Sequence, residues 1–128
     1  MAKQHSPAFL AMVETARSQI REVSIEDAVR LSRTEAAILV DVREDREFSR
    51  TGCLGAVHIG KGVIERDIEK RFPDKSTPLI LYCGGGFRSA LAALSLVQMG
   101  YRSVWSMAGG IRAWSQAGYP LRDDDHKP

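Results

Sequence analysis

Apolar runs of strand length alternate along the chain with stretches in which apolar residues recur at helical spacing. Residues 37–40 and 79–82 are short continuous apolar runs, the pattern of strands that are covered on both faces. Three further short strands are predicted at residues 21–23, 56–58 and 103–106. We therefore expect five strands, each separated from the next by a helical stretch or a glycine-containing loop.

Helical spacing and capping residues predict six helices. Their ranges are residues 7–20, 25–33, 44–50, 63–72, 90–99 and 111–116. Ser6 and Ser24 are predicted N-caps, and Gly100 is placed to end the fifth helix. The residues expected on inward faces are Phe9, Val13, Ala16, Ile20, Phe48, Val63, Ile64, Ile68, Ala90, Ala93, Leu94 and Val97.

Regular alternation of strand and helix predicts an α/β fold with a parallel sheet covered on both faces. The expected organisation is a helical extension at residues 1–20, one domain at 21–121 and a polar tail at 122–128. Ligands of such sheets bind beyond the carboxyl ends of strands. Cys83 follows one strand directly, and Asp41 and Arg43 come at the end of another, so we expect them at one edge.

Six residues, Cys83 to Arg88, separate the strand at 79–82 from the helix predicted after them. Gly84, Gly85 and Gly86 permit positive φ and let backbone N–H groups converge, while the following helix directs its positive end at the same place. This cradle favours a thiolate over a thiol, the state that a nucleophilic cysteine needs. The plainer interpretation is a small apolar residue at a strand end.

Composition excludes several classes of function. The formal charge is +2, from 18 basic and 16 acidic residues, which argues against nucleic acid as a partner. Two cysteines and three histidines show no ligand pairs at zinc spacing, so we expect no metal and no other cofactor. No apolar stretch approaches the length of a membrane span, and no signal peptide is visible. A free thiol fits a reducing cytoplasm.

Several motifs together resemble the rhodanese family of sulfurtransferases, over about residues 21–121. They are Leu-Val-Asp-Val-Arg-Glu at 39–44, Glu47-Phe48, the loop at 52–59, Leu-Tyr-Cys at 81–83 with its six-residue loop, and Gly-Gly before Trp114. The resemblance implies a central five-stranded parallel sheet. It also implies that Cys83 is the nucleophile, that residues 84–88 complete the cradle, and that Asp41 and Arg43 stand nearby. Cys53 occupies the position of the family's usual histidine.

The implied reaction is transfer of sulfur through a persulfide on Cys83, from an anionic donor such as thiosulfate to a thiophilic acceptor. That acceptor would be a small thiol, cyanide or a protein thiol. Arg88 would orient the donor, Phe87 would form a wall of the pocket, and Ser89 would support the loop. Nothing in the sequence decides between a monomer and a weak homodimer.

Two other functions remain open. Cysteine phosphatases and arsenate reductases use the same thiolate and cradle, but their arginine follows the cysteine after five residues, whereas Arg88 follows Cys83 after four. A catalytically idle binding or regulatory module is the other alternative.

Other residues have plainer interpretations beside the functional ones. Arg43 could pair with Glu44 or Glu47 instead of a substrate, and Asp41 could accept backbone N–H groups at its strand end. Cys53 could resolve an oxidised Cys83 or fill the core. The remaining candidates, which we expect to be structural, are His58, Trp105 and Trp114.

Overall fold

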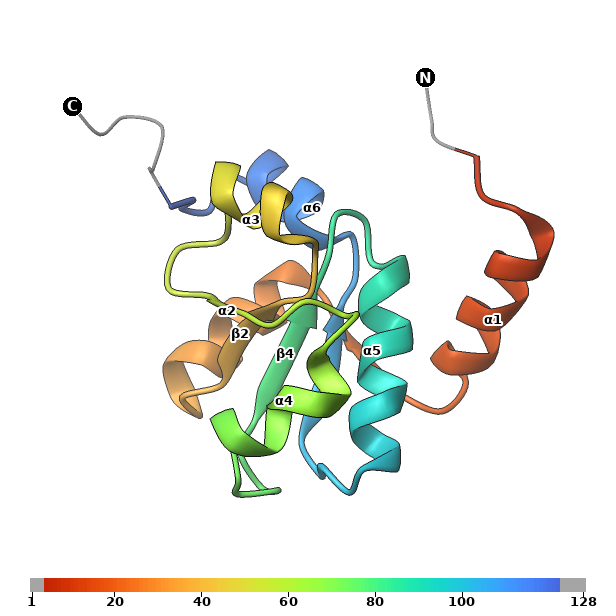
Figure 1. Ribbon diagram of the computed structural model, residues 1–128. Coiled ribbons are helices and arrows are strands. Elements are labelled where there is room, and N and C mark those ends of the chain that lie inside the picture. Colours follow the sequence, from red (N-terminus) through yellow and green to blue (C-terminus); the bar gives the residue numbers. More distant parts are fainter. Residues whose placement is uncertain (1–3, 123–128) are drawn as a thin grey trace.

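A computed structural model describes residues 4–122 of the chain (Figure 1). Its strands are β1 (Arg21–Val23), β2 (Ile38–Asp41), β3 (Val57–His58), β4 (Leu79–Tyr82) and β5 (Val104–Met107). All pair in parallel in one five-stranded sheet of order β1-β5-β4-β2-β3. This confirms the predicted fold class. It also brings the carboxyl ends of the central strands, β4 and β2, side by side.

Helices cover both faces of the sheet. Their bounds are α1 (Pro7–Arg17), α2 (Ile25–Thr34), α3 (Asp45–Arg50), α4 (Ile64–Arg71), α5 (Phe87–Gln98) and α6 (Gly110–Gln116). One apolar cluster lies between the sheet and α4 and α5, and a second between the sheet and α2 and α6. None of these helices within residues 4–122 combines the length and the apolarity needed to cross a bilayer.

The first helix packs on α5, not on the sheet. Figure 1 shows α1 on the side of α5 that faces away from the strands. Val13 and Ala16 of α1 are buried against Ala90 of α5 in a third cluster. Ser6 caps the helix as predicted, because its side chain accepts the N–H of Phe9 at 3.2 Å.

Some predicted boundaries and faces were wrong. α1 ends at Arg17, three residues early, because Ser18 already caps it and leads into β1. α5 begins at Phe87, not at residue 90, because Gly86 adopts φ +100° and serves as its N-cap. Val63 and Val97 are 37% and 38% exposed; the buried positions are Ile64 and Leu96 beside them. Of the predicted polar tail, residues 123–128 lie outside the described residues.

Candidate active site

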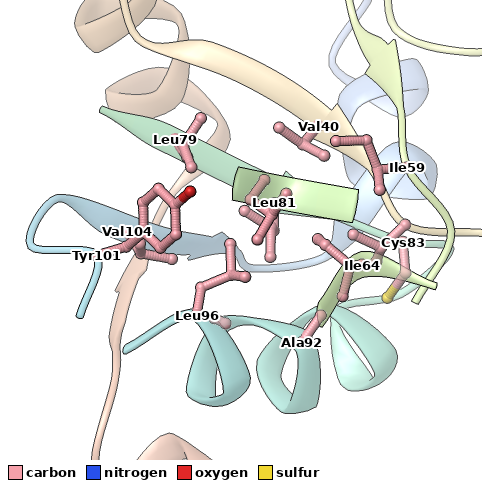
Figure 2. Packing of buried hydrophobic residues seen from close by; sticks show 13 residues of the cluster. Val40, Ile59, Ile64, Leu79, Leu81, Cys83, Ala92, Leu96, Tyr101 and Val104 are labelled. Carbon is pink, nitrogen blue, oxygen red and sulfur yellow. The ribbon is translucent and has the colours of Figure 1, made fainter. Parts of the chain in front are cut away.

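Cys83 follows the last residue of β4 and places its sulfur at the centre of the loop. Its Sγ accepts the N–H of Gly86 at 3.1 Å and the N–H of Ser89 at 3.3 Å. The residue is 1% exposed, and Figure 2 shows it at one end of the apolar cluster, near Ile64. N–H donors directed at sulfur stabilise negative charge on it more than they stabilise a neutral thiol.

The loop has this shape because of two close approaches of backbone to backbone. A Cβ on Gly86 would lie 3.2 Å from the backbone nitrogen of Gly109, at a φ that side chains rarely adopt. The first turn of α6 also holds the loop: the N–H of Ile111 donates to the carbonyl oxygen of Cys83 at 2.8 Å, and that of Arg112 to Gly84 at 3.2 Å. The cradle is therefore built by α6 as well as by the loop's own glycines.

Ser89 links Cys83 to the sheet. Its Oγ lies 3.5 Å from the sulfur of Cys83 and 2.8 Å from the Oγ of Ser106 on β5, and both serines are fully buried. The structure therefore brings Ser89 to the site, as expected. Ser106 was missed, since a serine in a strand carries no signal of what it faces.

Arg88 lies beside the loop but its guanidinium is already paired. Nη1 and Nη2 donate to the two carboxylate oxygens of Glu47 on α3, at 2.8 and 3.2 Å. This hydrogen bonding with Arg88 lowers the pKa of Glu47 to about 2. Arg88 also lies 3.4 Å from the position that a Cβ on Gly84 would occupy, so its positive charge is adjacent to the cradle.

A second arginine also lies close to the loop. Nη1 of Arg112, on α6, lies 3.1 Å from the position of a Cβ on Gly85. Sequence reasoning missed Arg112, because only the fold brings α6 to the cysteine loop. Within the described residues, Arg112 has no carboxylate at ion-pair distance.

Asp41 and Arg43 pair with each other. Asp41 is fully buried and accepts the backbone N–H of Arg43 at 2.9 Å, which confirms the strand-end interpretation. Its carboxylate also binds the Arg43 guanidinium at 2.7 Å. Asp41, rather than Glu44 or Glu47, is the ion-pair partner of Arg43, and the carbonyl oxygen of Thr51 accepts a further N–H from its guanidinium. These contacts hold Arg43 at the end of β2.

The ring of Phe87 lies 4.0 Å from the position of a Cβ on Gly85, between the cysteine loop and the N-terminal helix. It lies in the first turn of α5 and packs towards α1, with ring centroids 4.6 Å from His5 and 6.4 Å from Phe9. The guanidinium of Arg17 stands 5.1 Å from its ring centre. Because α5 begins at Phe87, this residue contacts Phe9 of α1 while it stays next to Gly85.

Cys53 is buried on the other face of the sheet from Cys83. It is 1% exposed in the cluster under α2 and α6, and its N–H donates to the Tyr82 hydroxyl at 3.0 Å. Burial raises the pKa of its thiol to about 12. The core-filling interpretation of Cys53 is therefore the one that fits its surroundings.

The three residues expected to be structural pack accordingly. The His58 ring stacks on Phe48 at 4.7 Å, and its Nε2 lies 2.8 Å from the carbonyl oxygen of Arg43. Trp114 is buried and donates to the carbonyl oxygen of Pro120, while Trp105 packs under the guanidinium of Arg21.

A pocket of about 630 Å³ opens beside the loop. Its lining includes Val42 and Arg88, together with residues 43–46 and 60–63 and Phe9 of α1. Val42 also belongs to the apolar cluster that contains Cys83. Among the described residues, no group of three or more His, Cys, Asp or Glu side chains could hold a metal ion.

Comparison with known proteins places this site in a family. The Rhodanese-like domain matches residues 24–117. The chain is 33% identical over 100 residues to thiosulfate sulfurtransferase GlpE of Actinobacillus succinogenes, covering 78% of this chain and 88% of that protein. It is 32% identical over 103 residues to the Pseudomonas putida protein of the same name, covering 80% and 91%.

Two solved structures cover nearly the whole chain. A Rhodopseudomonas palustris protein described as a possible tyrosine phosphatase has a TM-score of 0.79 at 31% identity, covering 95% of this chain and 99% of its own. The polysulfide-sulfur transferase homodimer of Wolinella succinogenes has a TM-score of 0.77 at 26% identity, with 94% and 92% covered. From the match over residues 24–117 and the relatives above 30% identity, we conclude that the chain belongs to the rhodanese-like family.

Proposed function

We propose that this protein is a sulfurtransferase that moves a sulfane sulfur from a small anionic donor, such as thiosulfate, to a thiophilic acceptor through a persulfide on Cys83. The observation that carries the proposal is the sulfur of Cys83 receiving two loop N–H groups, from Gly86 and Ser89. The activity named for the relatives from Actinobacillus and Pseudomonas supports the same reaction.

The reaction has two displacements at sulfur. The Cys83 thiolate attacks the outer sulfur of thiosulfate, a new S–S bond forms, and the old S–S bond breaks so that sulfite leaves with the electron pair. The acceptor then attacks the outer sulfur of the persulfide, and the electron pair of that bond returns to Cys83. Charge-assisted hydrogen bonds of about 1.5–3 kcal/mol each from the loop N–H groups stabilise the anionic sulfur.

Positive charge beside the loop attracts and orients the donor. Arg112 lies near Gly85 and Arg88 near Gly84. Because Glu47 already binds Arg88 through two hydrogen bonds, the sulfonate end of a donor competes with a carboxylate for that guanidinium. Arg112 has no such competitor among the described residues, so we assign it part of the donor's charge.

The loop is also the argument against a phosphatase. Four residues separate Cys83 from Arg88, and the arginine lies in the first turn of α5 with its side chain held by Glu47. Because both terminal nitrogens of Arg88 bind Glu47, its guanidinium is not free to encircle a tetrahedral oxyanion. A single sulfur atom in the cradle requires no such arm.

The surroundings of the reaction follow from the same chemistry. Both cysteines are free, which suits the reducing cytoplasm that we propose as the location. The homodimeric relative from Wolinella succinogenes supports a weak homodimer as the alternative to a monomer. Neither statement changes the residues assigned to the site.

Steady-state formation of thiocyanate from thiosulfate and cyanide tests the function. We expect turnover in the wild-type protein, its loss in Cys83→Ser, and its retention in Cys53→Ser, because the sulfur of Cys83 accepts two N–H groups from its own loop. Hydrolysis of a small aryl phosphate is the matched control reaction. Phosphatase turnover that depends on Cys83, in the absence of thiocyanate formation, would replace this proposal with the rival.

A further inference from the structure

The pocket beside the cysteine loop is far larger than the donor or cyanide requires. Its volume is about 630 Å³, within the range of roughly 300–1,000 Å³ that is usual for sites of organic ligands. Thiosulfate and cyanide have only a few atoms each. The size therefore fits a larger second substrate, and in a transfer reaction that substrate is the sulfur acceptor.

The pocket reaches the end of the cysteine loop at Arg88. Arg88 lines it and is adjacent to the loop, and Val42 lines it while packing in the cluster that holds Cys83. Val63, which is 37% exposed and immediately precedes α4, adds an apolar side chain to the lining. An acceptor bound here would have its reactive end near Cys83 and its body along these side chains.

Phe9 of α1 contributes a second apolar wall. It is half-buried, its ring lies 6.4 Å from that of Phe87, and it lines the pocket together with Arg88. The helix that carries it precedes residue 24, where the match to the rhodanese-like domain begins. The N-terminal helix, which lies outside the matched domain, therefore contributes a side chain to the lining of this pocket.

Lys61 is the one cation of the pocket lining that has no carboxylate partner among the described residues, and the carboxylate of Asp45 in the same lining lies 3.7 Å from Nδ1 of His58. The other three cations of the lining are each paired with a carboxylate: Arg43 with Asp41, Arg46 with Glu44, and Arg88 with Glu47. Lys61 is half-buried, and no carboxylate of residues 4–122 lies at ion-pair distance from it. A bound ligand with a carboxylate would supply the missing partner.

We propose that Phe9 and Lys61 form an acceptor subsite that selects a small organic thiol carrying an apolar chain and a carboxylate. The proposal rests on the function proposed above, because the thiol must find a persulfide on Cys83. The acceptor thiolate attacks the outer sulfur, its new S–S bond forms, and the bond to Cys83 breaks with the electron pair returning to Cys83. The product is an organic persulfide, and no further oxidant or reductant is needed.

Single-turnover removal of sulfur tests the subsite separately from persulfide formation. The full-length protein is loaded with thiosulfate, freed of excess donor and mixed with mercaptoacetate, with mercaptohexanoate or with neutral mercaptohexanol, all with terminal thiols. Intact mass then follows loss of the sulfur atom. We expect mercaptohexanoate to react about tenfold faster than mercaptoacetate at low concentration, the effect of burying roughly two methylenes. Mercaptohexanoate should also react about threefold faster than mercaptohexanol, an effect of the size expected for a surface ion pair.

Two variants divide these preferences. Phe9→Ala should reduce the preference for the long chain to about twofold or less, whereas Phe9→Leu, which keeps an apolar side chain, should retain most of it. Lys61→Gln should abolish the preference for the carboxylate and leave the chain-length preference. The controls are Leu10→Ala on the same helix and Lys70→Gln on α4, two exposed residues outside the lining.

The outcomes separate the two proposals. If thiosulfate leaves no sulfur on the wild-type protein, the sulfurtransferase function fails and the subsite fails with it. If the persulfide forms but short and long thiols remove it equally fast, only the subsite is wrong. The subsite is also wrong if Phe9→Ala and Leu10→Ala have the same effect on the chain-length preference. A thermal melt of each variant serves as the control, because it shows whether α1 is still folded.

Discussion

The two cysteines of this protein have opposite surroundings at their sulfur atoms. Cys83 accepts two backbone N–H groups, whereas Cys53 is enclosed by apolar residues and by the Tyr82 ring system. Burial raises the pKa of the Cys53 thiol to about 12, so that side chain is a thiol at any ordinary pH. Since a thiolate and not a thiol is the nucleophile, we expect Cys53 to be unreactive.

Alkylation by iodoacetamide should therefore distinguish the two residues. We expect Cys83 to be modified at least about tenfold faster than Cys53 in the folded protein at neutral pH. Peptide mass mapping after timed quenching measures both rates in one sample. Equal alkylation rates of Cys83 and Cys53 in the folded protein would remove the argument that the loop activates Cys83.

Among the carboxylates at the site, Glu47 has the pKa that is most clearly lowered. Hydrogen bonding with Arg88 lowers its pKa to about 2 from an ordinary value of 4.5. The folded state thus holds the carboxylate more strongly than the unfolded chain does. The stabilisation is complete above about pH 5 and is lost progressively as the pH falls towards 2.

Acid unfolding should report this pair. Glu47→Gln should flatten the fall in melting temperature between about pH 5 and pH 2, because an amide has no carboxylate to protonate. Glu26→Gln, at an exposed position on α2, is the matched control. If the wild-type protein and Glu47→Gln lose stability in parallel over that range, Arg88 and Glu47 do not pair in solution.

At the scale of elements, the cradle depends on the docking of α6 against the cysteine loop. Gly110 begins α6 with φ +59°, and a Cβ there would overlap the carbonyl oxygens of Cys83 and Gly84. Gly118 has φ +83° but open space around its Cβ position. Both glycines therefore have a left-handed backbone conformation that strains a side chain. They differ because Gly110, unlike Gly118, lies close to another backbone segment.

This difference predicts unequal effects of the same substitution. Gly118→Ala should cost about 1–2 kcal/mol of stability, the ordinary penalty of a side chain at that φ. Gly110→Ala should cost more than this and should also impair sulfur transfer, since α6 must move away from the loop that it holds. Equal melting temperatures and equal activities for the two variants would show that the loop does not need α6 at this distance.

How much of the fold could be predicted is clearest at β4 and α5. The apolar run at residues 79–82 predicts β4 with the bounds that the structure shows, because four continuous apolar residues after a proline are typical of a buried strand. The start of α5 could not be predicted, because three glycines leave the choice of positive φ to the tertiary structure. That choice places Phe87 in the first turn of α5, where its ring lies near Phe9 of α1.

The site was predictable only where its residues are neighbours in sequence. Cys83, its glycines and Ser89 form one segment, and their chemistry follows from that segment. Glu47, Arg112 and Phe9 come to the site from three separate helices, and none of them has a local pattern that indicates its partner. Asp41 and Arg43 were placed at the correct edge, but their mutual ion pair depends on burial that a sequence does not display.

At the scale of the whole molecule, the sheet topology gathers the working parts at one edge. The order of the strands sets β4 next to β2, so the cysteine loop faces the segment that leads into α3 and its glutamate. The N-terminal helix, outside the matched domain, reaches the same edge through its packing on α5 (Figure 1). We expect one sulfur atom to be loaded onto Cys83 at this edge.

Intact mass of the protein after incubation with thiosulfate tests that claim most directly. We expect the mass to increase by that of one sulfur atom and cyanide to remove the added atom. The increase should be absent in Cys83→Ser and present in Cys53→Ser. A protein that stays at its original mass, or an adduct that persists in Cys83→Ser, would contradict the assignment of Cys83 as the sulfur carrier.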